Sequence, residues 1–193
     1  MSSRDRILNA VKNNQPAKVE LPSIQNFEQT EKDNVKKFTE MLTFIGGTIV
    51  EAQGFDGVKA YIKEAFEVNK RTLSTIPELN EITEQNTNYS DPHSLNDVYL
   101  TVLKGEFGVA ENGAIWTTDH QLPARALPFI TEYLAVVIEK KSIVATMHEA
   151  YDEIGSLDYG FGVFIAGPSK TSDIEQSLVL GAHGPKGMTV FLI

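Results

Sequence analysis

The sequence contains no cysteine among its 193 residues. That absence excludes a disulfide framework, a zinc site built on thiolates, an iron–sulfur cluster held by this chain's own thiolates, and a cysteine nucleophile. Positive charge is also scarce, because 17 Lys and Arg residues stand against 26 Asp and Glu residues, for a net charge of −9. Nucleic acids and anionic membranes bind basic faces, so we expect neither as a partner.

Long apolar runs are absent as well. The longest one covers residues 133–138 and is far shorter than the roughly 20 residues of a transmembrane helix. The first residues lack the apolar core of a signal peptide, so we expect a cytoplasmic protein. The histidines do not have the spacing of a metal-binding motif, and no metal site is predicted. They are His93, His120, His148 and His183.

Helical and strand patterns alternate along the chain. A chain of this length buries about 70% of its unfolded surface, enough for a core of its own. Amphipathic helices are predicted at residues 4–11, 27–45, 57–68, 142–154 and 172–180. Strands are predicted at residues 48–50, 71–76, 97–103, 134–138, 161–166 and 188–193, with a hairpin at 107–119 that turns at the Asn-Gly pair 112–113. This order predicts a single α/β domain over residues 1–193, in which residues 1–26 form a helix and a connector.

The segment 161–176 combines an apolar strand, a Gly-Pro turn and a hydroxyl-rich start of a helix. A continuous apolar strand is typical of a parallel sheet that is covered on both faces. Free N–H groups at a helix start, beside the carboxyl ends of such strands, bind anions. The alternative is that Ser169, Thr171, Ser172 and Asp173 only cap the helix.

Three other places could carry chemistry. His183, between two glycines, is either an acid–base or ligand residue or part of a structural turn. Glu111, at the hairpin turn, could act as a general base or attack an acyl group, or it could be a solvated turn residue. Arg125 could bind a carboxylate in a bidentate manner or form a surface ion pair.

The C-terminal motifs resemble those of the LUD-domain family, the LutC/YkgG group of lactate utilisation proteins. Residues 167–175 read GPSKTSDIE and residues 178–185 read LVLGAHGP, while residues 110–115, AENGAI, are similar to the family's AETGTI segment. The resemblance is strong from about residue 98 to residue 193. Asn112 stands where the family usually has Thr, and Lys170 where Arg is common, which gives up the planar fork of arginine.

This resemblance implies a fold similar to the NagB/RpiA/CoA-transferase group, a Rossmann-like and mostly parallel sheet. It also implies a non-redox component of an iron–sulfur system that oxidises L-lactate to pyruvate. Because the chain lacks cysteine, iron–sulfur clusters are expected only in LutA/LutB-like partner proteins, and no cofactor is expected on this chain. The alternatives are a CoA-transferase-like or sugar-phosphate isomerase-like enzyme that uses Glu111, and a plain interaction module.

The motifs together predict one site for a small anionic metabolite. The loops 167–173 and 183–185 and the carboxylate of Glu111, the tentative catalytic residue, are expected to converge there, because strands of one sheet open at a common edge. The predicted ligand contacts are Gly167, Pro168, Ser169, Thr171, Ser172, Asp173, His183, Gly184, Pro185 and Arg125.

Overall fold

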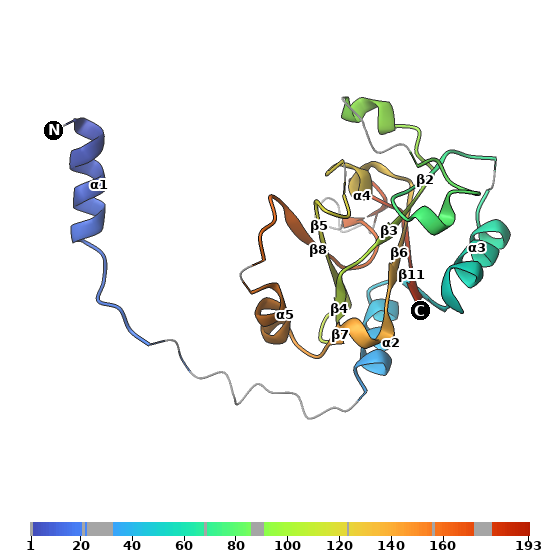
Figure 1. Ribbon diagram of the computed structural model, residues 1–193, viewed down its shortest axis with the longest axis horizontal. Helices are drawn as coiled ribbons and strands as arrows, with labels where there is room; N and C mark the ends of the chain where they lie inside the picture. The colour runs from blue at the N-terminus through green and yellow to red at the C-terminus, as the bar shows by residue number, and fades with distance from the viewer. Residues whose placement is uncertain are drawn as a thin grey trace.

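A computed structural model describes residues 2–20, 22, 33–67, 69–85, 91–122, 124–155, 157–171 and 179–193. Helix α1 (Ser3–Asn13) lies apart from the rest of the molecule, and none of its residues is buried (Figure 1). It begins at a capping box, in which the hydroxyl of Ser2 accepts from the N–H of Asp5 and the Asp5 carboxylate accepts from the N–H of Ser2. The predicted N-terminal helix is therefore present, with its apolar side chains exposed to solvent.

A five-stranded parallel sheet forms the centre of the fold, in the order β1-β11-β6-β3-β2. Its strands are β1 (Thr48–Glu51), β2 (Thr72–Ser74), β3 (Leu100–Lys104), β6 (Tyr133–Ile138) and β11 (Gly187–Leu192). The α/β class and the mostly parallel sheet predicted from the sequence are thus confirmed. No helix in the described ranges has the length and apolar character needed to cross a membrane.

Alternation of side chains along the strands builds a core on each face of this sheet. On one face, Leu134 and Val136 pack in a cluster with Phe38 and Leu42 of α2 (Asn34–Phe44). On the other, Ala135 and Val137 pack in a cluster with α3 (Gly54–Ala65), through Val58 and Ile62. Because successive residues of a strand point to opposite faces, one apolar run serves both clusters.

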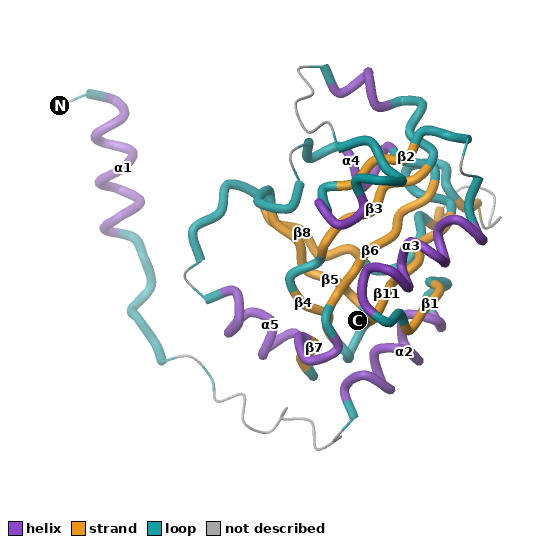
Figure 2. The backbone as a smooth tube through the Cα atoms, turned by 45° about the vertical axis from the view of Figure 1, so that its right-hand side comes forward, coloured by secondary structure: helices purple, strands orange, loops and turns teal. Residues whose placement is uncertain are grey.

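A second sheet of four strands continues from the first, in the order β7-β4-β5-β8. Its strands are β4 (Phe107–Val109), β5 (Ala114–Thr118), β7 (Ile143–Val144) and β8 (Gly162–Ile165). Strand β3 runs into β4, and β6 runs into β7 through a short 3₁₀ helix, so the two sheets share two stretches of chain. Helix α5 (Met147–Ile154) packs on this sheet, on the opposite side of the strands from α3 (Figure 2).

The remaining described elements are short. They are the 3₁₀ helices η2 (Pro77–Leu79), η3 (Pro92–Leu95) and η4 (Lys140–Ser142), helix α4 (Leu127–Ile130), and the two-stranded ribbon of β9 (Lys170–Thr171) and β10 (Val179–Leu180).

Three local predictions need correction. Strand β8 is antiparallel to β5 in the second sheet, whereas its apolar run predicted a strand of the parallel sheet. Residues 143–144, predicted as helix, pair with β4, and the helix begins only at Met147, where Thr146 caps it. The end of the helix predicted at 172–180 is strand β10, because it pairs with β9; residues 172–178 lie outside the described ranges.

The predicted hairpin is confirmed, with β4 and β5 antiparallel around the turn at 111–113. Gly113 has a φ of +70°, a conformation that a side chain would strain. The side-chain oxygen of Asn112 accepts from the N–H of Ala114 across the turn, 3.0 Å away.

Candidate functional site

Backbone hydrogen bonds connect the two C-terminal motifs, residues 167–175 and 178–185, which were predicted to share a site. The N–H of Ser169 donates to the carbonyl of Pro185 at 2.8 Å, and the N–H of Gly181 donates to the carbonyl of Ser169 at 3.1 Å. A Cβ built on Gly184 would lie 3.1 Å from the Cβ of Ser169, so this glycine permits the close approach. The Ser169 N–H is therefore already engaged within the protein and is not a free donor for an anion.

Glu111 and Gly167 lie at the same edge of the second sheet, as predicted. Strands β4 and β8 are both antiparallel to β5, so their ends point the same way. The space between the two turns is occupied by the end of α2: a Cβ built on Gly167 would lie 3.0 Å from the carbonyl oxygen of Ile45, and one on Gly113 would lie 3.3 Å from the Ile45 Cδ1. The two turns therefore pack on a helix end.

The carboxylate of Glu111 is turned toward α5. Its Oε2 accepts from the N–H of Met147, the first residue of that helix, at 2.8 Å. A carboxylate at this place satisfies an orphan donor and interacts favourably with the helix dipole. The geometry gives Glu111 a helix-capping contact.

His183 and Gly184 line a cavity of about 470 Å³ with residues that precede β3 and β6. This cavity lies beside the amino ends of the parallel strands, whereas the sequence predicted a site at the carboxyl ends. Asp97 and Glu132 contribute carboxylates to its wall. Among the other predicted contacts, Thr171 lies in strand β9, and Ser172 and Asp173 lie outside the described ranges.

Arg125 lies away from this group and lines a separate hollow of about 470 Å³. Its Nη2 donates one long bond, 3.3 Å, to the Oδ2 of Asp119, and its guanidinium stacks 5.1 Å from the ring centre of Phe161. His120 and Tyr159 line the same hollow. The His120 ring has no hydrogen-bond or ion-pair partner in the part of the chain that the structure describes.

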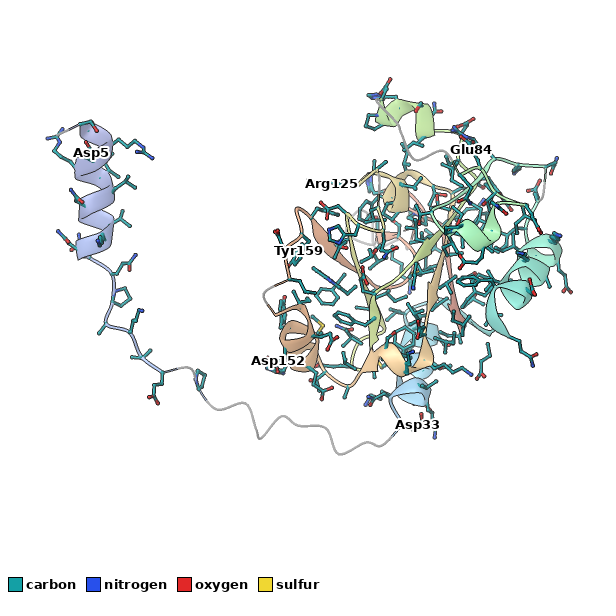
Figure 3. The ribbon with its side chains drawn as sticks, in the orientation of Figure 1. Asp5, Asp33, Glu84, Arg125, Asp152 and Tyr159 are labelled. Atoms are coloured by element: carbon teal, nitrogen blue, oxygen red, sulfur yellow. The ribbon has the colours of Figure 1, made fainter. Side chains whose placement is uncertain are left out.

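An adjoining cleft of about 360 Å³ shares His120, Asp158 and Tyr159 with the Arg125 hollow. We call the two cavities together the α5 cleft. Its residues Glu106 and Phe107 lie at the junction of β3 and β4, and Lys141 and Ser142 follow the neighbouring strand β6. The α5 cleft thus lies outside the carboxyl ends of two adjacent parallel strands, where open α/β sheets bind ligands. Figure 3 shows Arg125 and Tyr159 on the same side of the molecule as Asp152 of α5.

Aromatic side chains line the inner part of the α5 cleft. Trp116 is 5% exposed, and its ring centre lies 4.6 Å from that of Phe164 and 5.5 Å from that of Tyr159. Phe107, Val144 and Leu157 complete the apolar lining. Packing on several sides fixes these rings, so the wall is formed before any ligand arrives.

Charged residues stand around the aromatic wall. The carboxylates of Glu106, Glu153 and Asp158 belong to the lining, together with Lys141. A hydrogen bond of 2.7 Å to the Glu139 carboxylate raises the pKa of Lys141, so its ammonium group already has an anionic partner. Arg125 is therefore the permanent cation of the α5 cleft that has only one long bond to a described residue.

Sequence reasoning selected Arg125 but missed His120, Trp116 and Tyr159. The signal was present in part, because Glu106 and Lys141 each lie three residues beyond the end of a predicted strand. Their meeting with residues 157–159 depends on how α5 packs on the second sheet, which was not predicted. No group of three or more His, Asp or Glu residues within the described ranges could hold a metal ion.

Comparison with known proteins agrees with the motifs. The family model of the LUD domain matches residues 83–193, more than half of the chain. The chain belongs to the LUD domain family. The match begins before η3 and runs through the C-terminal strand β11, so it includes both C-terminal motifs and the α5 cleft.

Curated relatives of this LUD domain protein carry the name lactate utilization protein C. One from Bacillus pumilus is 37% identical over 99 residues, which cover 48% of this chain and 41% of the relative. One from Shouchella clausii is 36% identical over 95 residues, or 46% of this chain and 40% of the relative. The matched stretch thus spans about two fifths of the length of these relatives.

A solved structure supports the fold. The crystal structure of a DUF162 family protein from Deinococcus radiodurans superimposes with a TM-score of 0.65 and 14% sequence identity. The superposition covers 86% of this chain and 99% of that one. At this identity, the likeness establishes the architecture of this LUD domain protein.

Proposed function

We propose that this LUD domain protein is a non-redox component of a lactate-utilising system, and that it binds a small 2-hydroxy or 2-oxo carboxylate in the α5 cleft. The relatives named lactate utilization protein C support the pathway. The absence of cysteine supports a division of labour in which iron–sulfur partner proteins transfer the electrons. The kinship with the NagB/RpiA/CoA-transferase group stays a prediction.

One observation carries the choice of site. Of the two cavities that contain predicted ligand residues, the α5 cleft presents a permanent cation, Arg125, whose guanidinium has one long bond to a described residue. A guanidinium fork matches the two oxygens of a carboxylate. In the cavity at His183, the carboxylates of Asp97 and Glu132 are already paired with Arg71 and Lys186, the described lining contains no Lys or Arg, and the Ser169 N–H is engaged.

The expected contribution of Arg125 follows from its exposure. Hydrogen bonds to charged groups contribute about 1.5–3 kcal/mol each at best. The Arg125 side chain is 59% exposed and is shared with Asp119, so the lower end of that range applies. Removal of the guanidinium should therefore weaken carboxylate binding about tenfold.

Titration calorimetry of the purified protein with L-lactate and pyruvate tests the site. Arg125→Gln should bind about tenfold more weakly than the wild type. Arg125→Lys keeps the charge but not the guanidinium fork, so its affinity should lie between those of the wild type and Arg125→Gln. His183→Ala, in the other cavity, is the matched control and should bind like the wild type. If Arg125→Gln binds as tightly as the wild type and His183→Ala loses affinity, the ligand binds in the cavity at His183 instead.

Growth tests the pathway. Deletion of the gene should abolish growth on L-lactate, and a plasmid copy should restore it. Normal growth of the deletion strain, with an unchanged rate of lactate oxidation, would refute the proposed role.

The alternative enzyme function, with Glu111 as nucleophile or base, finds no support in the geometry. The Glu111 carboxylate accepts from the N–H of Met147 and is not part of the lining of the α5 cleft.

A further inference from the structure

The shape of the α5 cleft specifies the ligand more narrowly than the proposed function does. We infer that its ligand is a 2-hydroxy or 2-oxo acid with a branched or aromatic side chain, which binds more tightly than lactate does. This inference rests on the proposed function, because it assumes that the carboxylate binds at Arg125. It adds a second subsite, for the side chain of the acid.

Size is the first argument. The part of the cleft beyond the Arg125 hollow measures about 360 Å³. Cavities of about 300–1,000 Å³ accommodate ligands of drug size. The methyl group of lactate would leave most of this volume to water, whereas an isobutyl or benzyl group would occupy it.

The lining is the second argument. Phe107, Trp116 and Val144 offer apolar surface, and Trp116 is held against Phe164 and Tyr159. Leu157, on the same wall, is 61% exposed. A ligand side chain that covers Leu157 removes apolar surface from water on both partners, which favours a large apolar group.

The connection between the two cavities is the third argument. His120, Asp158 and Tyr159 line both of them. A 2-hydroxy acid has three polar or apolar substituents on one carbon: its carboxylate meets Arg125, its hydroxyl meets the shared polar residues, and its side chain enters the aromatic part. The residues that line both cavities thus connect the cation to the aromatic part.

The acidic residues around the aromatic part restrict the ligand further. Glu106, Glu153 and Asp158 outnumber Lys141, which is already paired with Glu139, so they would repel a second anionic group placed there. The side chain of the ligand is therefore uncharged, and dicarboxylates are excluded from the class.

Trp116 provides a specific readout, because it is the only tryptophan in the sequence. Titration calorimetry and tryptophan fluorescence are measured on the full chain with L-lactate, L-2-hydroxy-4-methylpentanoate, L-3-phenyllactate and L-malate. One added methylene in an apolar pocket changes binding about 10–200-fold, so the two larger monocarboxylates should bind at least about tenfold more tightly than lactate. They should also change the emission of Trp116, and malate should bind no better than lactate.

Val144→Phe narrows the apolar part and leaves the Arg125 hollow unchanged. This variant should lose the preference for the larger acids over lactate. Val19→Phe is the matched control, since Val19 is 86% exposed outside the cleft and should leave all affinities unchanged. Circular dichroism of each variant verifies folding.

The outcomes separate the two proposals. If lactate binds in an Arg125-dependent manner but the larger acids bind equally or more weakly, this inference is overturned and the carboxylate site stands. A preference that survives in Val144→Phe also overturns it. If none of the acids binds in an Arg125-dependent manner, the carboxylate site itself is wrong, and the inference falls with it.

Discussion

Replacement of Gly113 by alanine tests how tightly the turn at Glu111 packs on α2. The φ of Gly113 is +70°, and an added Cβ would lie 2.9 Å from the backbone nitrogen of Leu42 and 3.0 Å from its Cα. Backbone atoms of a helix cannot move aside as the end of a side chain can. The substitution should therefore strain both the turn and α2.

Gly54 provides a matched control for the conformational part of this cost. Its φ is +64°, and an added Cβ would meet nothing within 4 Å. A left-handed conformation costs an alanine about 1–2 kcal/mol. Alanine also lowers the conformational entropy of the unfolded chain, which stabilises the folded state by about 0.4–1 kcal/mol. Gly54→Ala should therefore lower the free energy of unfolding by about 1 kcal/mol.

Gly113→Ala should show the same conformational cost and an additional steric one. Overpacking of a well-packed region costs about 1–3 kcal/mol, so the total loss should reach about 2–4 kcal/mol. Urea unfolding, followed by the fluorescence of Trp116, measures both variants in one assay. Trp116 suits this purpose because it is 5% exposed and is the only tryptophan.

Equal destabilisation by the two alanines would refute the reasoning. Independent substitutions add only to within about 0.5 kcal/mol. If the free energies of unfolding of the two variants differ by less than this, α2 moves to accept the new Cβ with no measurable loss of stability. The packing of this turn on α2 would then add nothing measurable to stability.

Three further predictions use other parts of the chain. Glu111→Ala should lower the free energy of unfolding by about 1 kcal/mol in urea unfolding, because the N–H of Met147 loses its acceptor, whereas Glu111→Gln should lose less. Gly162→Ala should cost about 1–3 kcal/mol and shift the Trp116 emission, because the new Cβ would lie 2.3 Å from that ring. Hydrogen bonds from Ser2 lower the pKa of Asp5. The capping contribution to the stability of α1 is therefore complete above the ordinary carboxylate pKa and is lost as the pH falls through the lowered value. NMR chemical shifts should show α1 fraying in that pH range, and the same fraying should begin at higher pH in Ser2→Ala.

The sequence predicted the secondary structure of the parallel sheet well because its strands are short, apolar and bounded by clear turns. The run at residues 134–138 is an example, since its apolar side chains are buried on both faces of β6. The hairpin at Asn112 and Gly113 was predictable for a local reason, the preference of this pair for a left-handed turn.

The assignment of strands to sheets was not predictable in the same way. The run at residues 161–166 is apolar throughout, but its partner is β5 of the second sheet, and pairing depends on contacts distant in sequence. Residues 143–144 carry a helical pattern but pair with β4, where tertiary pairing overrides local preference.

Parts of the predicted arrangement of loops are present in the structure, although the loops do not all meet. The motifs at Ser169 and Pro185 do meet, and Glu111 and Gly167 do share an edge, because β4 and β8 run in the same direction and each ends at one of these turns. The structure places Arg125 away from these motifs, although the sequence predicted it in the same site, and His120 was not among the predicted site residues. Both depend on the position of the segment after α5, which no periodicity in the sequence specifies.

The two sheets pass directly into each other. Between β3 and β4 stand only Gly105 and Glu106, and the N–H of Gly105 still donates to the carbonyl of Val137, so strand pairing continues into the junction. A Cβ on Gly105 would lie 2.5 Å from Ile115 of the second sheet and 2.7 Å from Ile138 of the first, which leaves no space for a hinge there. The sheets therefore cannot open one at a time, and their amide protons should exchange with solvent in a single cooperative event. A ligand in the α5 cleft, bound over this junction, would slow exchange in both sheets at once while α1 continued to exchange freely.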